Sequence, residues 1–304
     1  MPERSKLMTY NEFLETMKTE VQNRLGEAYR VDLQDVIKTN DTVYNGLTIA
    51  DKTINIAPTI YLNDMYEKYG TDTDGAVEAV LEILNNNKCN EDLDISFFVD
   101  WNIVKDKIVY RIVNTERNRK MLEDVPHINY LDLSIIYYVM MEQFDDGNAT
   151  ILIHNSHMKA WNKSVEDLMD LATVNTKEIV PYTVKSMYDT MLDILELKGA
   201  DIPAELYQSN ESSMYVISNK SLLYGSSAMI DKEFLRELGG KFGSFIILPS
   251  SIHELIILPC DEAECNLEEC SEMVKEVNET LLSTEDILSD HAYFYNAYLG
   301  DITY

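Results

Sequence analysis

The stretch that decides the fold is Phe245-Ile-Ile-Leu-Pro-Ser-Ser-Ile-His-Glu-Leu-Ile-Ile-Leu-Pro259. Two apolar runs of strand length flank a short polar insert, and each run ends at a proline, which belongs at a strand end or edge. The pattern predicts two buried strands on either side of a bend.

Outward from these two expected strands, helices and strands come in blocks. Helices are expected over residues 10–25, 62–69, 73–86, 164–172, 183–198, 232–238 and 267–277, with strands over 29–38, 42–49, 53–60, 107–114, 131–141, 150–154, 214–218 and 222–229. Blocks without strict strand–helix alternation favour an α+β fold, with largely antiparallel sheets and flanking helices. The polar stretch 199–213 reads as a linker between two subdomains, residues 1–198 and 210–304.

Composition limits the classes of function. The 304 residues include 25 Lys and Arg against 53 Asp and Glu, a formal net charge of −28. That charge repels phosphate backbones and anionic lipid surfaces, so direct nucleic-acid binding and membrane binding are not expected. The sequence shows neither a secretory signal nor a run of about 20 apolar residues, so we expect a soluble, cytoplasmic protein.

The polar insert holds the candidate catalytic residues. Ser250, Ser251, His253 and Glu254 are the side-chain types of a nucleophile, a base and an orienting acid. If the insert is a strand, Ser251 and His253 share one face and Ser250 and Glu254 the other. No Gly-x-Ser-x-Gly turn accompanies them. The alternative is a structural bend in which the serines bind main-chain amides.

Histidines and cysteines are the candidate metal ligands of the chain. His154 and His157 have the spacing His-x-x-His and are candidates for two metal ligands, but two ligands do not define a site. Cys260, Cys265 and Cys270 are spaced too widely for a zinc or iron–sulfur site, and acidic neighbours raise a thiol pKa. We therefore expect no metal and no cofactor.

Several short motifs resemble an uncharacterised family of bacterial proteins, one of the groups of unknown function found in anaerobic gut-type bacteria. The motifs are 45–47, 58–62, 125–126, 132–133, 214–219, 224–228, Leu-Pro-Ser-Ser-Ile-His-Glu at 248–254 with Pro259, 277–278 and 288–290. Ser218 stands where the family pattern has Thr, and Ser226 where it has Ala. The resemblance spans nearly the whole chain and implies no activity, because the family has no established one.

Three functions stay open from the sequence. The first is a protein-binding or regulatory module that uses an acidic surface rich in tyrosine, of which the chain has 19. The second is a hydrolase using Ser251 or Ser250 with His253 and Glu254. The third is an acidic mimic of nucleic acid that inhibits a basic DNA-binding protein.

Overall fold

The computed structural model describes residues 8–51, 59–86, 98, 100–144, 147–197, 213–261 and 265–304. Contacts divide the chain into two units, residues 1–38 with 42–96 and residues 39–41 with 97–304. The linker predicted at 199–213 falls almost wholly outside the described residues. The contacts do not divide the chain there, since strands from either side of that stretch pair in one sheet.

The first unit consists of helices packed on a three-stranded sheet. Its elements are α1 (Tyr10–Leu25), η1 (Gly26–Ala28), β1 (Tyr29–Ile37), β2 (Val43–Asp51), β3 (Thr59–Tyr61), α2 (Asn63–Tyr69) and α3 (Thr73–Asn86). The strands are antiparallel in the order β1-β2-β3. Thr9 caps α1, because its hydroxyl accepts a hydrogen bond from the Glu12 backbone N–H while the Glu12 carboxylate accepts one from the Thr9 backbone N–H. The predicted strand over 53–60 lies largely outside the described residues.

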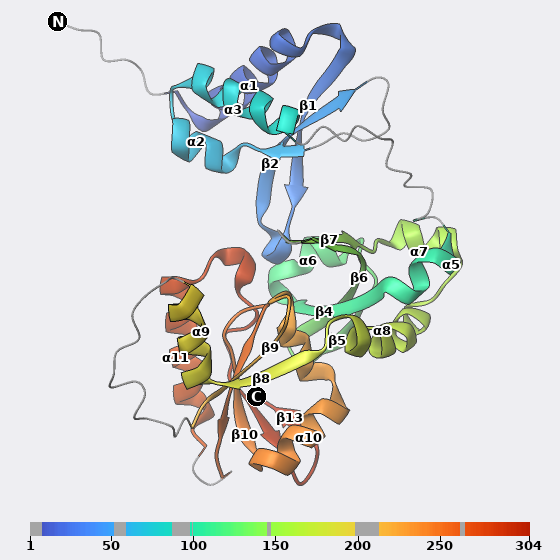
Figure 1. Ribbon diagram of the computed structural model, residues 1–304, viewed down its shortest axis with the longest axis vertical. Helices are drawn as coiled ribbons and strands as arrows, with labels where there is room; N and C mark the ends of the chain where they lie inside the picture. The colour runs from blue at the N-terminus through green and yellow to red at the C-terminus, as the bar shows by residue number, and fades with distance from the viewer. Residues whose placement is uncertain are drawn as a thin grey trace, which may run out of the picture. The chain divides into compact units, whose positions relative to one another are not determined.

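The second unit contains two antiparallel sheets (Figure 1). The four-stranded sheet has β4 (Ile108–Asn114), β5 (His127–Tyr130), β6 (Leu133–Phe144) and β7 (Gly147–Leu152); the six-stranded sheet has β8 (Tyr182–Ser186), β9 (Tyr215–Asn219), β10 (Phe245–Pro249), β11 (Leu255–Pro259), β12 (Tyr293–Asn296) and β13 (Asp301–Thr303). The order in the larger sheet is β13-β12-β10-β11-β9-β8. The two strands predicted on either side of the bend are β10 and β11, and the structure pairs them antiparallel from Phe245 with Pro259 to Pro249 with Leu255.

Helices and short turns cover the two sheets. They are η2 (Thr39–Asp41), α5 (Trp101–Val104), η3 (Lys105–Lys107), η4 (Glu116–Asn118), α6 (Arg119–Leu122), α7 (Asn155–Trp161), α8 (Val165–Ile179), α9 (Met187–Leu197), η6 (Gly225–Ile230), α10 (Lys232–Phe242), α11 (Leu267–Leu281) and η8 (Thr284–Asp286). The fold is therefore α+β with antiparallel sheets, as the sequence predicts. No helix among the described residues is both long enough and apolar enough to cross a membrane.

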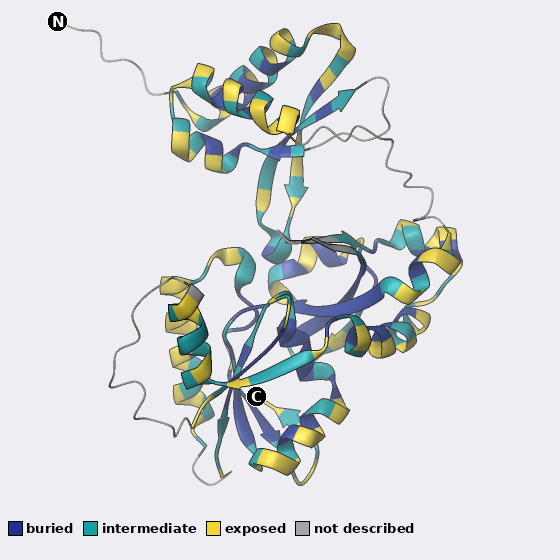
Figure 2. Cartoon of the chain, viewed as in Figure 1, coloured by how far each residue is buried: buried dark blue, intermediate teal, exposed yellow. Residues whose placement is uncertain are grey.

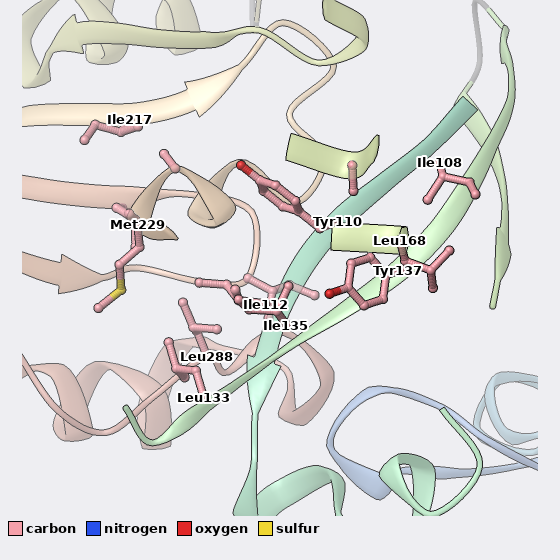
Figure 3. Packing of buried hydrophobic residues seen from close by; sticks show 14 of the residues in the cluster. Ile108, Tyr110, Ile112, Leu133, Ile135, Tyr137, Leu168, Ile217, Met229 and Leu288 are labelled. Atoms are coloured by element: carbon pink, nitrogen blue, oxygen red, sulfur yellow. The ribbon is translucent and has the colours of Figure 1, made fainter. Parts of the chain in front are cut away.

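One apolar core lies between the two sheets. Alternate residues of β4 and β6, among them Ile108, Tyr110, Ile135 and Tyr137, point into it, and Ile217 of β9 belongs to the same cluster (Figure 3). The opposite face of the larger sheet is covered by α9 and α11. There Ile246 packs in a second cluster with residues of α11, and Lys185 of β8 pairs with Asp193 of α9.

Several predicted elements differ from the structure, and α8 and α11 extend beyond their expected ends to Ile179 and Leu281. The helix expected over 183–198 begins as strand β8, which pairs with β9, and only Met187–Leu197 is helical. The strand expected over 222–229 is the 3-10 helix η6, entered through Tyr224 at a φ of 57°. Helix α10 continues past Gly239 to Phe242, where Gly243 at a φ of 76° ends it. Strand β5 was not predicted.

Candidate functional site

The predicted polar insert is a loop, not a strand, between β10 and β11. Its serines bind other parts of the same loop: the Ser250 hydroxyl donates to Glu254 Oε1 at 2.8 Å, and the Ser251 hydroxyl accepts the His253 backbone N–H at 3.0 Å. The Ser251 amide donates to the Glu254 carbonyl at 3.2 Å. The condition under which Ser251 and His253 would share a strand face is therefore not met, and residues 250–254 form the bend that was the alternative from the sequence.

The imidazole of His253 is held from two sides. Its Nδ1 lies 3.2 Å from the backbone nitrogen of Tyr224, whose N–H it accepts, and its Nε2 lies 3.4 Å from Asp286 Oδ1. The His253 and Tyr224 rings stack with centroids 5.5 Å apart. Burial lowers the pKa of His253, while the Asp286 carboxylate acts in the opposite direction. Both ring nitrogens thus have partners other than Ser250 and Ser251.

The loop is also tied to η6 and to β9 through its main chain. The Ser226 hydroxyl donates to the Ile252 carbonyl at 2.6 Å, and the Ser218 hydroxyl donates to the His253 carbonyl at 2.9 Å. Gly225 lies so close that an added Cβ would be 2.6 Å from Ser218 Cα and 2.7 Å from the His253 oxygen. These residues form one closely packed structure, which we call the His253 corner: Ser218, Tyr224, Gly225, Ser226, residues 250–254 and Asp286.

An arginine beside this corner was not among the predicted residues. The Arg111 guanidinium lies over the Tyr224 ring, with Cζ 4.3 Å from the centroid, and Arg111 is only 8% exposed. The Tyr138 ring meets the Tyr224 ring edge-on at 5.4 Å. The signal in the sequence is a single cation in the middle of the apolar strand Ile-Val-Tyr-Arg-Ile-Val. Figure 2 shows that β4 is buried along its whole length.

A second polar cluster joins the start of β6 to the chain before β12. The carboxylate of Asp132 accepts the Ser289 hydroxyl at 2.7 Å and the Tyr293 hydroxyl at 2.6 Å, and the Ser289 oxygen accepts the His291 amide at 3.1 Å. Burial raises the pKa of Tyr293, and Asp132 adds to the effect. The serine meets the carboxylate directly, with no imidazole between them. The arrangement serves to fix β12 rather than to activate a nucleophile.

The predicted metal ligands are placed for other contacts. His154 Nδ1 lies 2.9 Å from Asp124 Oδ2, and His157 Nδ1 accepts the His154 backbone N–H at 2.9 Å. The His157 ring packs beside Trp161, and burial, followed by His154, lowers its pKa. In the part of the chain that the structure describes, no group of three or more His, Cys, Asp or Glu side chains is arranged to hold a metal ion.

The three cysteines of the acidic segment lie at or near the ends of β11 and α11. Cys260, Cys265 and Cys270 are half-buried. Burial raises the pKa of the Cys270 thiol first, and the Glu269 carboxylate raises it further. The acidic neighbours therefore act on Cys270 in the direction that the sequence predicts.

Comparison with protein-family models gives one match. A family of unknown function, DUF5688, matches residues 10–297. The chain belongs to this family. The match confirms the resemblance to an uncharacterised family that the sequence motifs indicate. Comparison with curated proteins and with solved structures gives no match.

The DUF5688 match includes the first unit and almost all of the second, so both the His253 corner and the Asp132 cluster lie inside it. Motifs that are far apart in the chain meet in these two places. Ser218 and Ser226 meet the loop 250–254, and Asp132 meets Ser289. The sequence motifs thus coincide with the packing of the second unit.

Proposed function

We propose that this DUF5688 chain is a protein-binding module, with its binding surface on α9 and α11. The observation that carries the proposal is a set of large apolar side chains left exposed on these two helices. They are Met191 (44% exposed), Ile194 (46%), Met273 (53%), Val277 (37%) and Leu281 (76%). We call this set the α9–α11 surface.

Strand register supports the assignment of both helices to one face of the larger sheet. Lys185 pairs with Val216, Val216 with Ile256, and Ile256 with Leu248, so these four side chains point the same way. Lys185 contacts α9, and Leu248 belongs to the cluster that packs on α11. The exposed apolar side chains of the two helices therefore arise on the same side of the sheet.

The spacing on α11 shows that its exposed side chains form a stripe. Met273, Val277 and Leu281 follow one another at intervals of four residues, whereas Val274 and Asn278 are buried. Helix α9 also carries several large apolar side chains, yet none of its residues 187–196 is buried (Figure 2). Exposed apolar side chains that recur along a helix are typical of a protein contact.

The charges around the α9–α11 surface select the partner. Helix α9 carries three carboxylates and α11 carries five, against a single lysine, Lys275. We infer that the partner presents an amphipathic helix with apolar residues flanked by Lys and Arg. A second copy of this chain is disfavoured, because it brings the same negative charge to the contact. Methionine suits such a surface, since its flexible side chain adapts to different partners.

The other two functions gain less support. In the His253 corner, the imidazole contacts and the serine contacts are separate, which gives the hydrolase alternative no supporting geometry. A mimic of nucleic acid binds its partner mainly through negative charge, and that charge does not account for an exposed apolar stripe. The stripe on α11 therefore favours a protein partner that buries apolar surface.

A synthetic peptide tests the proposal. The probe is an amphipathic helix of Leu and Lys, followed by fluorescence anisotropy in about 0.15 M salt, where long-range attraction is screened. The full-length protein is expected to bind it, and the double variant Met273→Gln/Val277→Gln to bind about tenfold more weakly. Val174→Gln is the matched control, because Val174 on α8 is 57% exposed outside the proposed surface.

Two further peptides separate the alternatives. The same peptide with Glu in place of Lys should not bind, and oligolysine should bind weakly and lose binding in high salt. If oligolysine binds as tightly as the amphipathic peptide, charge alone explains the interaction and the apolar surface plays no part. Equal weakening by Val174→Gln also contradicts the proposal.

A further inference from the structure

Arg111 is the one buried cation among the side chains that the structure describes. It lies in β4 between Val109 and Val113, on the sheet face opposite to the main core. Charged side chains are almost never buried unless they are paired, because removing a charge from water is costly. The surroundings of Arg111 therefore need an explanation.

The contact that the structure gives to the Arg111 guanidinium is the face of the Tyr224 ring, at 4.3 Å. Within the described ranges, it forms neither a hydrogen bond nor an ion pair. The carboxylates of the His253 corner are engaged elsewhere, Asp286 with His253 and Glu254 with Ser250. A ring face offsets part of the charge but accepts none of the five N–H groups that a guanidinium offers.

A second polar group close to Arg111 is also without a partner. Tyr138 is 2% exposed, and its hydroxyl is buried with no hydrogen-bond partner. Arg111 pairs with Ile136 across the strands, so Tyr138, two residues further along β6, points to the same face. Burial raises the pKa of Tyr138, and the Arg111 charge opposes that effect, as expected for neighbours. A buried hydroxyl left unpaired is costly in a native protein.

We propose that Arg111 and the Tyr138 hydroxyl bind the oxyanion group of a small molecule, a carboxylate or a phosphate. A guanidinium presents its N–H groups as a fork that fits two oxygens of one anion, and a phenol donates a further hydrogen bond. Such a ligand satisfies both groups at once and neutralises the buried charge. The chain has a net charge of −28, yet Arg111 forms no ion pair within the described residues, which suits it to an anion from outside.

Tyr224 links this site to the His253 corner. Its ring lies under the guanidinium and stacks on His253, while Tyr138 meets it edge-on. An anion bound at Arg111 would therefore be connected to the His253 corner through the Tyr224 ring. The site is independent of the α9–α11 surface, and either proposal can fail without the other.

Thermal unfolding of the full-length protein tests the site, with inorganic phosphate and acetate as probes and sodium chloride added to constant ionic strength. Binding to the native state raises the Tm, by roughly 3–5 °C at about ten times Kd. Arg111→Met should abolish the rise, and Tyr138→Phe should reduce it. Arg117→Met is the matched control: Arg117 pairs with Asp290 at 2.8 Å, so its loss should leave the rise unchanged.

The outcomes are distinct. A rise with phosphate alone assigns a phosphate group to the ligand, a rise with acetate alone assigns a carboxylate, and both support the site when Arg111→Met removes them. Equal Tm values in phosphate, acetate and chloride overturn the proposal, as does an anion effect that Arg117→Met removes equally. If Arg111→Met does not fold, Tyr138→Phe tests the proposal instead. A rise in Tm as large as that of the unaltered protein in this variant contradicts the proposed role of the hydroxyl.

Discussion

The backbone N–H of Tyr224 donates a hydrogen bond to Nδ1 of His253, over 3.2 Å, and the two rings stack. This contact fixes the tautomer of the neutral imidazole, because a nitrogen that accepts a hydrogen bond carries no proton. The proton then resides on Nε2, which faces Asp286. His253 thus joins three segments of the second unit: the loop after β10, the start of η6, and η8.

Stability should depend on pH through His253. Burial places its native pKa below 6.5, the unfolded value, so the unfolded chain takes up a proton first as the pH falls. This contribution to stability is complete above about pH 6.5 and declines below it. His253→Asn should flatten the decline when urea unfolding is measured at about pH 8 and about pH 5.5. His291→Asn, a change at an exposed position, should leave the decline as it is in the unaltered protein. If the free energy of unfolding falls equally with pH in all three proteins, His253 does not have this role.

Gly225 should not tolerate a side chain. Its Cβ would overlap the main chain of Ser218 and His253, and backbone atoms cannot move aside cheaply. We expect Gly225→Ala to lower the free energy of unfolding by about 1–3 kcal/mol. Gly240→Ala, in α10 with nothing within 4 Å of the added atom, should raise it by about 0.5–1 kcal/mol. Urea unfolding of both variants gives the comparison, and a neutral Gly225→Ala contradicts the packing described for the corner.

Asn40 and Asn118 should be energetically coupled. Asn40 is buried at a φ of 59°. Its backbone N–H donates to Asn118 Oδ1 at 2.6 Å, and the side-chain Nδ2 of Asn118 donates to Asn40 Oδ1 at 2.7 Å. Each change to Ala leaves a buried partner unsatisfied and should cost about 1–3 kcal/mol. The double variant should cost about 1 kcal/mol less than the sum, as a double-mutant cycle measures. Strict additivity would show that the pair does not act together.

The Cys270 thiol should react slowly. Burial and the Glu269 carboxylate keep its pKa above the ordinary value, so less thiolate is present at neutral pH. Iodoacetamide labelling followed by mass spectrometry should be slower at Cys270 than in a free cysteine peptide at about pH 7.5. The difference should narrow as the pH rises. Labelling as fast as in the peptide would contradict a raised pKa.

Much of the fold follows from local pattern. The apolar runs on either side of residues 250–254 predict β10 and β11, and Thr9, a residue type that favours the N-cap, predicts the start of α1. Strand β8 was missed because Tyr182–Ser186 leads directly into α9 without a glycine or proline between them. Its strand conformation comes from pairing with β9, which is a tertiary contact. Gly239 predicted a helix end, but it lets α10 approach Tyr295, where an added Cβ would lie 2.9 Å from the ring.

The sequence located the His253 corner but not its organisation. The polar insert at 250–254 stands out, whereas the partners of His253 come from Tyr224 and Asp286, which no spacing rule connects to it. Arg111 was overlooked because a strand that alternates apolar residues commonly turns its polar residues to solvent. Here Tyr224 and Val180, together with Met121 and Leu122 of α6, pack on that face and bury it as well.

The most direct test of the proposed function uses the methionine methyl groups as reporters on the full-length protein. In a spectrum of methyl-labelled methionine, assigned through Met191→Leu and Met273→Leu, the signals of Met191 and Met273 should shift as the Leu/Lys peptide is added and reach a plateau. The signals of Met17 and Met65, buried in the first unit, should stay in place. Peptide binding that leaves Met191 and Met273 unshifted would contradict the proposal that the α9–α11 surface binds the partner.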